Sequence, residues 1–211
     1  MRVLSVNVGL PREMVWKGRE FSSGIAKSPV AGRIMAGHLN LAGDRQADLV
    51  NHGGSGKAMY AYPVEHYPFW EEFFGRELPM GALGENLTIE GLTESASIGD
   101  RFEIGGTVVV ITQPREPCFK LAALHEREEV VAAFLKSGRC GFYLAVEREG
   151  EIGAGDEIVP LARDPREVSI AALNALLRGA PIPTDVLERA LELEVLPEYW
   201  RAKVAVRLAK S

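Results

Sequence analysis

One cysteine lies where two prolines stiffen the chain. Cys118 follows the strand-like run 108–112 and belongs to the octapeptide Gln-Pro-Arg-Glu-Pro-Cys-Phe-Lys at 113–120. Proline restricts its own backbone and the residue before it, so we expect the strand to stop here and present its end at a sheet rim. Positive charge at Arg115 and Lys120 would favour the thiolate, which is a nucleophile or a soft metal ligand. The alternative is a free cysteine that packs as a small hydrophobe.

A histidine in a glycine-rich segment is the second candidate. His52 precedes two glycines within 43–58, where the backbone can approach a ligand closely. Its ordinary pKa lies near neutrality, so we expect it to relay protons. The segment is not a P-loop, because Asn51 replaces the first glycine and Ala58 replaces the hydroxyl residue. It also lacks the strand and helix of a dinucleotide fingerprint. An ordinary loop histidine is the alternative.

Four further polar residues lie near turn signals. Glu85 and Asn86 stand at the entrance to a predicted strand, where they could orient His52, bind a polar ligand or simply form a turn. Lys27 and Arg33 flank another proline. They are either ligand-binding cations or part of a solvated surface.

Composition narrows the class of protein. The chain has 211 residues, a formal charge of −5, 46% hydrophobic and 25% charged residues, as in a soluble globular protein. The acidic balance argues against a general nucleic-acid binder, and no apolar run is long enough to span a membrane. The N-terminus alternates like a strand and shows no export signal, so we expect a cytoplasmic protein. Its two cysteines, Cys118 and Cys140, match no zinc or disulfide pattern, and we interpret Cys140 as structural.

The first 160 residues are predicted to be rich in β-structure. Short strand-like runs of residues, separated by glycine-containing turn signals, indicate strands. Aromatic or apolar residues at helical spacing indicate two helices. The expected strands are 2–8, 31–39, 58–62, 86–89, 101–104, 108–112, 141–146 and 157–161, and the expected helices are 63–74 and 125–136. Many short strands with close turns favour a barrel or sandwich over a doubly wound sheet.

The remaining residues are predicted to be helical. Three short helices are expected at 169–177, 183–191 and 197–208, with Ser169 and Thr184 as N-caps. The predicted fold is therefore mainly β with α. A β-barrel domain over 1–162 is followed by a three-helix subdomain over 163–211.

Seven motifs in order give the sequence a family resemblance. They are Lys-Ser-Pro-Val-x-Gly-Arg at 27–33, Gly-Asp-Arg-Gln-Ala-Asp at 43–48, His-Gly-Gly at 52–54, Gly-Glu-Asn-Leu-Thr at 84–88, Ile-Gly-Asp at 98–100, Gln-Pro-Arg-x-Pro-Cys-x-Lys at 113–120 and Gly-Asp at 155–156. The chain resembles the MOSC domain family, named for the C-terminal domain of molybdenum cofactor sulfurases. Its C-terminal helices resemble the three-α appendage of the YiiM-like branch.

The resemblance implies a MOSC β-barrel, a molybdenum cofactor (molybdopterin), and protection against N-hydroxylated bases such as 6-hydroxylaminopurine. It gives no reason to expect pyridoxal phosphate. Cys118 is then the metal ligand, and Cys118, His52 and Glu85 form the catalytic set. The cofactor-binding residues implied are Lys27, Arg33, Asn86, Arg115 and Lys120.

Three functions remain open at this point. The leading hypothesis is a molybdenum-dependent reductase of small N-hydroxylated compounds, with no nucleic-acid or membrane partner and with homodimerisation possible. Its electrons would come from a separate protein, because the sequence shows no flavin, haem or iron–sulfur motif. A second hypothesis is a carrier that holds the cofactor, or a sulfur on Cys118, without turnover. A third is a metal-free thiol hydrolase that uses Cys118, His52 and Glu85.

Overall fold

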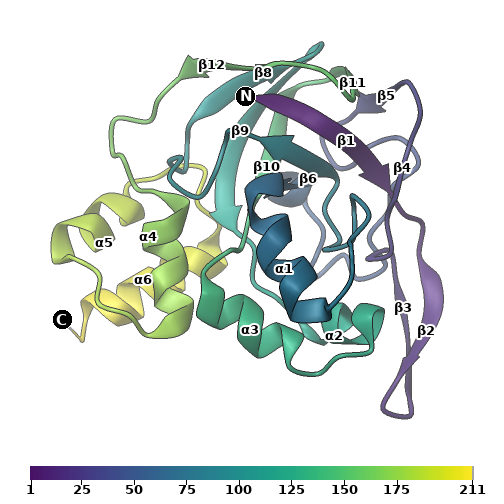
Figure 1. The fold of residues 1–211 in the computed structure, drawn as a ribbon. Helices are drawn as coiled ribbons and strands as arrows, with labels where there is room; N and C mark the ends of the chain where they lie inside the picture. The colour runs from purple at the N-terminus through teal and green to yellow at the C-terminus, as the bar shows by residue number, and fades with distance from the viewer. Residues whose placement is uncertain (211) are drawn as a thin grey trace.

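An eight-stranded sheet forms the centre of the molecule (Figure 1). The computed structural model describes residues 1–210. The strand order is β12-β8-β9-β10-β6-β7-β1-β4, and β6 pairs with β7 in parallel while the other neighbouring strands are antiparallel. The strands are β1 (Arg2–Val8), β4 (Ser28–Pro29), β6 (Met59–Pro63), β7 (Leu87–Glu90), β8 (Arg101–Ile104), β9 (Thr107–Pro114), β10 (Phe142–Arg148) and β12 (Ile158–Ala162). Seven of them match predicted strands closely, because alternating or continuous apolar runs mark the buried positions. The two-residue strand β4 was not predicted.

The predicted closed barrel is not confirmed. The ladder is open, with β12 and β4 at its ends. The sheet nevertheless curls, so that the chain leading into β12 contacts β1. Val3 N donates to Asp156 O at 2.9 Å and Gly155 N donates to Val3 O at 2.8 Å. These bonds bring the two sides of the sheet together without a continuous ladder.

Two small antiparallel pairs lie outside the main sheet. A hairpin of β2 (Arg12–Trp16) and β3 (Arg19–Ser23) extends along one side of the molecule (Figure 1), and β5 (Arg33–Ala36) pairs with β11 (Gly150–Gly153). The sequence did not indicate the hairpin, whose residues are mostly exposed or half-buried. The strand predicted at 31–39 is shorter than expected.

Helices cover one end of the sheet and form the C-terminal part of the chain (Figure 1). They are α1 (Tyr67–Phe74), α2 (Phe119–His125), α3 (Val130–Ser137), α4 (Ile170–Asn174), α5 (Thr184–Leu191) and α6 (Glu198–Leu208), with 3-10 turns η1 (Ser55–Lys57), η2 (Val64–His66) and η3 (Ala175–Arg178). The sequence analysis missed α2, which begins directly after Cys118. Trp70 and Trp200 are fully buried, as expected for large aromatic side chains in a core.

The two predicted N-caps have different outcomes. Ser169 Oγ accepts from Ala172 N at 3.1 Å and caps α4, which confirms that prediction. The prediction for Thr184 is wrong, because Pro183 is the N-cap and Thr184 already belongs to α5.

Backbone hydrogen bonds join the C-terminal helices to the rest of the chain. Ile98 N donates to Val168 O, and Ile170 N donates to Ala96 O, both at 2.9 Å. The division into domains at 162/163 stays a prediction. Within residues 1–210, none of the helices combines the length and the apolar character that crossing a bilayer would need.

Candidate functional site

A pocket opens beside the end of β9, near β6 and β10. Its empty volume is about 640 Å³, and segments far apart in the sequence line it. Six of the eight predicted site residues lie on its walls: Lys27, His52, Asn86, Arg115, Cys118 and Lys120. We call this space the inner pocket. The structure thus brings most of the candidate chemistry to one place.

Cys118 stands at the rim of the sheet, as predicted. β9 runs to Pro114, and Cys118 has an extended backbone, with φ −132° and ψ 173°. Its carbonyl accepts from Leu121 N at 3.0 Å and so begins α2. The thiol is partly exposed and lies 3.9 Å from His52 Nε2. This placement in a pocket favours a chemical role over simple packing.

His52 is neutral at neutral pH. Burial lowers its pKa to about 4, and the nearby Lys120 lowers it further, while Asp48 has the opposite effect. The Asp48 carboxylate lies 4.0 Å from His52 Nε2. The pKa of His52 is therefore not near neutrality, in contrast to the expectation from the sequence, and its role as a proton relay stays a prediction. The neutral ring can accept a hydrogen bond from the thiol.

Asp48 is a site residue that the sequence analysis missed. The backbone and side-chain N–H groups of Asn51 donate to its carboxylate and hold its pKa at about 2, with Lys120 adding to the effect. Lys120 Nζ lies 3.6 Å from it. Asp48 is therefore ionised and holds Lys120 near the thiol. The Gly-Asp-Arg-Gln-Ala-Asp motif was the available signal.

A buried ion pair forms another wall of the inner pocket. Lys27 Nζ donates to Asp44 Oδ1 at 2.5 Å, and both side chains are at most 8% exposed. Burial lowers the pKa of Lys27, although Asp44 opposes this effect. Asp44 also accepts from Gly9 N at 2.8 Å and from Asn86 Nδ2 at 3.0 Å. Asp44, which was not predicted as a site residue, thus positions two residues that were.

Arg115 is a buried cation with an unused donor. The residue is 5% exposed, and its guanidinium lies 4.8 Å from the ring centroid of Tyr60 and 5.0 Å from that of Phe134. Among the described residues, Nη1 has no hydrogen-bond partner. A buried donor is costly to leave unpaired. Its position on the pocket wall therefore suits an anionic or strongly accepting ligand.

The structure does not bring Glu85 to the pocket. Its side chain is fully buried and accepts hydrogen bonds from Tyr67 OH, from Gly81 N at 2.8 Å, from Leu83 N at 3.0 Å and from Thr88 Oγ1 at 2.8 Å. Burial raises its pKa, although these donors oppose the shift. Because these internal donors enclose the carboxylate, Glu85 does not line the inner pocket, and its catalytic role stays a prediction.

Arg33 is also placed elsewhere. Its side chain is exposed and forms two bonds to the Asp156 carboxylate, at 2.6 and 3.0 Å, and one to Glu151 O at 2.8 Å. It therefore ties β5 to the segment around β11. The structure does not support the predicted cofactor contact, because this local pairing directs the guanidinium away from the inner pocket.

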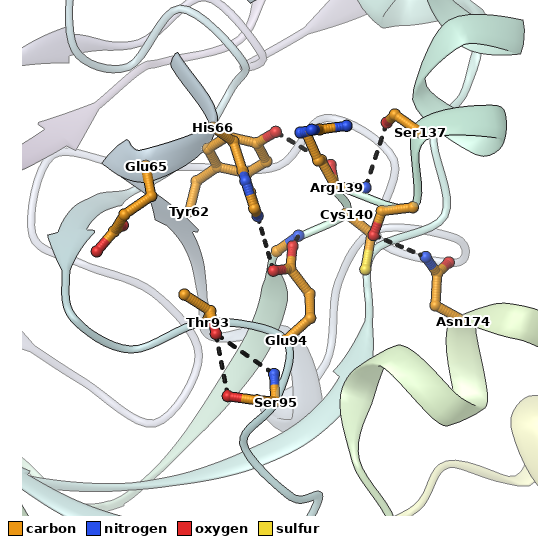
Figure 2. A network of polar contacts seen from close by, with 12 residues as sticks. Tyr62, Glu65, His66, Thr93, Glu94, Ser95, Ser137, Arg139, Cys140 and Asn174 are labelled. Atoms are coloured by element: carbon orange, nitrogen blue, oxygen red, sulfur yellow. Dashed lines mark hydrogen bonds and ion pairs between the residues drawn. The ribbon is translucent and has the colours of Figure 1, made fainter. Parts of the chain in front are cut away.

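A second group of the same residue types, drawn in Figure 2, is mostly buried. His66 Nε2 and Glu94 Oε2 lie 2.7 Å apart, and Glu94 Oε1 accepts from Gly141 N at 2.8 Å. Cys140 is 1% exposed, and burial raises the pKa of its thiol. Asn174 of α4 donates to Gly138 O at 3.1 Å beside it. We call this group the closed cluster; its geometry is that of a structural element.

The donor set in the inner pocket limits how a metal could bind. Within residues 1–210, no group of three or more His, Cys, Asp and Glu side chains is arranged to hold a metal ion. Cys118 offers one soft ligand. Lys27 and Lys120 are paired with the carboxylates of Asp44 and Asp48 on the same walls, and Arg115 adds positive charge with an unused donor. These residues fit an anionic cofactor that brings the metal's other ligands with it.

Comparisons with known proteins agree with this architecture. The MOSC domain family matches residues 48–159, and the YiiM-like, 3-alpha helix domain family matches residues 168–211. The chain is 42% identical to YflK of Bacillus subtilis, over 95% of this chain and 91% of that protein. A Gibberella moniliformis protein named Reductase is 29% identical over 83% of this chain, which spans only 32% of that protein.

A solved structure agrees over the whole length. The crystal structure of YiiM from Geobacillus stearothermophilus has a TM-score of 0.80 and 33% identity, with 98% of each chain covered. The curled mixed sheet and the C-terminal helices are thus shared with this relative. The chain belongs to the MOSC domain family and carries the YiiM-like three-helix domain at its C-terminal end.

Proposed function

We propose that the inner pocket binds the molybdenum cofactor and that the loaded protein reduces N-hydroxylated compounds such as 6-hydroxylaminopurine. The observation that carries the proposal is the unpaired, buried Nη1 of Arg115 on the wall of a pocket that also holds a partly exposed thiol. Membership of the MOSC family supports the choice of cofactor. The name of the fungal relative supports reduction as the class of reaction.

The cationic side chains would hold the anionic part of the cofactor. Arg115 can donate to phosphate oxygens in a fixed fork, and Lys27 and Lys120 add charge without that geometry. The amide of Asn86 is fixed by Asp44. Cys118 would supply a thiolate to the metal.

His52 prepares Cys118 for this role. Because His52 is neutral at neutral pH and its Nε2 lies 3.9 Å from the thiol, it can accept a hydrogen bond from the thiol and orient it for this role. Lys120, held by Asp48 at 3.6 Å, adds positive charge on the same wall.

The reaction balances with an external electron donor. R–NH–OH takes up two electrons and two protons, the N–O bond breaks, and R–NH₂ and water leave. The cofactor, when bound, would transfer the electrons to the substrate. A separate donor protein is part of the proposal, since the sequence has no flavin, haem or iron–sulfur motif. A cytoplasmic location and a homodimer stay predictions.

Turnover by the purified protein tests the proposal. Protein is prepared from cells with intact and with defective cofactor synthesis and is given a reduced viologen and 6-hydroxylaminopurine. We expect adenine to form only with the first preparation. Bound molybdenum without turnover would favour the carrier hypothesis. Activity of metal-free protein towards an ester or amide that is abolished by thiol alkylation would favour the hydrolase, supported by the Cys118–His52 pair.

A further inference from the structure

A larger cleft continues outward from the inner pocket. Its empty volume is about 1580 Å³, and it is lined by the 50–57 loop, the 113–120 segment and residues of α6. The two spaces share Cys118 and His52 on their walls. We call the larger space the outer cleft. The candidate reacting group thus lies at the junction of two spaces.

The walls of the two spaces differ in chemistry. The outer cleft has flat apolar surfaces from the rings of Phe119, Tyr143 and Tyr199 and from Pro117. Its charged side chains, Asp48, Glu116, Lys57 and Lys120, are mixed in sign and also line the inner pocket. The buried Lys27 and Arg115 line only the inner pocket. The outer cleft therefore suits a flat, uncharged polar molecule better than a phosphate.

The C-terminal helix α6 is attached directly to the cysteine segment. Glu116 Oε2 accepts from Tyr199 OH at 3.0 Å and from Lys203 Nζ at 2.9 Å. Trp200 Nε1 donates to Gln113 Oε1 at 3.0 Å. These bonds fix α6 relative to Pro117 and Cys118. The helical segment is thereby a wall of the outer cleft as well as a part of the core.

We infer that the outer cleft binds a planar nitrogen heterocycle, and that Tyr199 of α6 determines substrate specificity there. The inference deepens the proposed function and rests on it for the place of reaction. Aromatic rings stack on heterocycles. Glu116 and the glycine-rich loop supply hydrogen-bonding groups for the edge of such a ring. Tyr199 is 56% exposed, so a contact with substrate is a better account of its position than core packing.

Kinetics of three α6 variants test the role of Tyr199. For loaded protein with 6-hydroxylaminopurine, we expect Tyr199→Ala to raise KM about tenfold, with kcat changed less than about twofold, because one stacking surface is lost. Tyr199→Phe keeps the ring but not the bond to Glu116, and should retain most of the affinity. Val206→Ala is the matched control, since Val206 is equally exposed and does not line the outer cleft. An unchanged KM in Tyr199→Ala would overturn the inference.

Calorimetric titration with 6-hydroxylaminopurine separates the inference from the proposed function. Binding that weakens about tenfold in Tyr199→Ala but not in Val206→Ala, without any turnover, would support the inference while the proposed function fails. Turnover with identical binding by all variants would support the proposed function and contradict the inference. Absence of binding to the unaltered protein would overturn the inference outright.

Discussion

The inner pocket and the closed cluster contain the same kinds of side chain in opposite states. In the closed cluster His66 and Glu94 meet at 2.7 Å, and Cys140 is shielded from solvent. In the inner pocket His52 lies 3.9 Å from Cys118 Sγ and 4.0 Å from Asp48. Residue type therefore does not decide the role. Polar groups that satisfy one another stabilise the fold, and groups left partly unsatisfied remain available to a ligand.

The surrounding elements explain the contrast. The closed cluster is enclosed by the β6–α1 connection, the 93–95 turn, the 137–141 turn and α4 (Figure 2). The inner pocket lies under the 43–57 loop, which is attached to β9 through Gly56 O. Thr112 Oγ1 donates to that carbonyl at 2.7 Å. A loop that crosses the rim of a sheet leaves room for a ligand, whereas helices and turns packed against one another do not.

Replacing either cysteine singly by alanine should give the largest difference in turnover between the inner pocket and the closed cluster. Cys118→Ala removes the proposed ligand, and we expect turnover to fall by about 10³-fold or more. Cys140→Ala should keep its turnover but lose about 1 kcal/mol of unfolding free energy, because it leaves a small cavity. Initial rates and urea unfolding measure the two effects. Equal turnover in both variants would contradict the distinction.

Removing one carboxylate from the closed cluster and one from the inner pocket should show which group contributes more to the stability of the fold. Glu94→Ala leaves His66 and Gly141 N without their partner, and we expect a loss of about 3 kcal/mol of unfolding free energy. Asp48→Ala breaks half-exposed contacts and should cost under about 1 kcal/mol. Urea unfolding monitored by circular dichroism compares them. A larger loss of unfolding free energy in Asp48→Ala than in Glu94→Ala would contradict the structural role assigned to the closed cluster.

Acid should destabilise the protein through its buried, neutral histidines. Burial lowers the pKa of His125 from 6.5 to about 4, as it does for His52. Between these values the unfolded chain binds more protons than the folded chain, so stability falls as the pH is lowered from 6.5 towards 4. After allowance for partial exposure, we expect His125 to account for about 1 kcal/mol of the loss by pH 5.

The His125→Gln variant isolates this effect. Glutamine can still donate to Ala82 O, which His125 Nε2 contacts at 2.9 Å, but it does not titrate. Urea midpoints at pH 7 and pH 5 should differ less in the variant than in the unaltered protein. An equal shift of the urea midpoint in both proteins would show that His125 does not contribute to the loss of stability in acid.

The sequence predicted the parts of the site that depend on local order. Cys118 follows a strand and a proline pair, and its place at the sheet rim could be read from those neighbours. The apolar runs located the main strands, whereas the exposed β2–β3 hairpin has no such pattern. An open or closed ladder depends on contacts between residues such as Val3 and Asp156, which periodicity does not specify.

Long-range pairing explains why Arg33 and Glu85 do not line the inner pocket. Arg33 is fixed by Asp156, 123 residues away, and Glu85 is enclosed by donors that include Tyr67. A motif shows that these residues are polar but not which partner they find. The pKa of His52 likewise depends on burial and on Lys120, 68 positions further along the chain.

Molybdenum content tests the central claim most directly. The unaltered protein, Cys118→Ala and Cys140→Ala are purified from cells with intact cofactor synthesis, and metal and protein are quantified. We expect about one molybdenum per chain in the unaltered protein and in Cys140→Ala, and a loss of about tenfold or more in Cys118→Ala. A molybdenum-free unaltered protein, or full molybdenum in Cys118→Ala, would contradict the account.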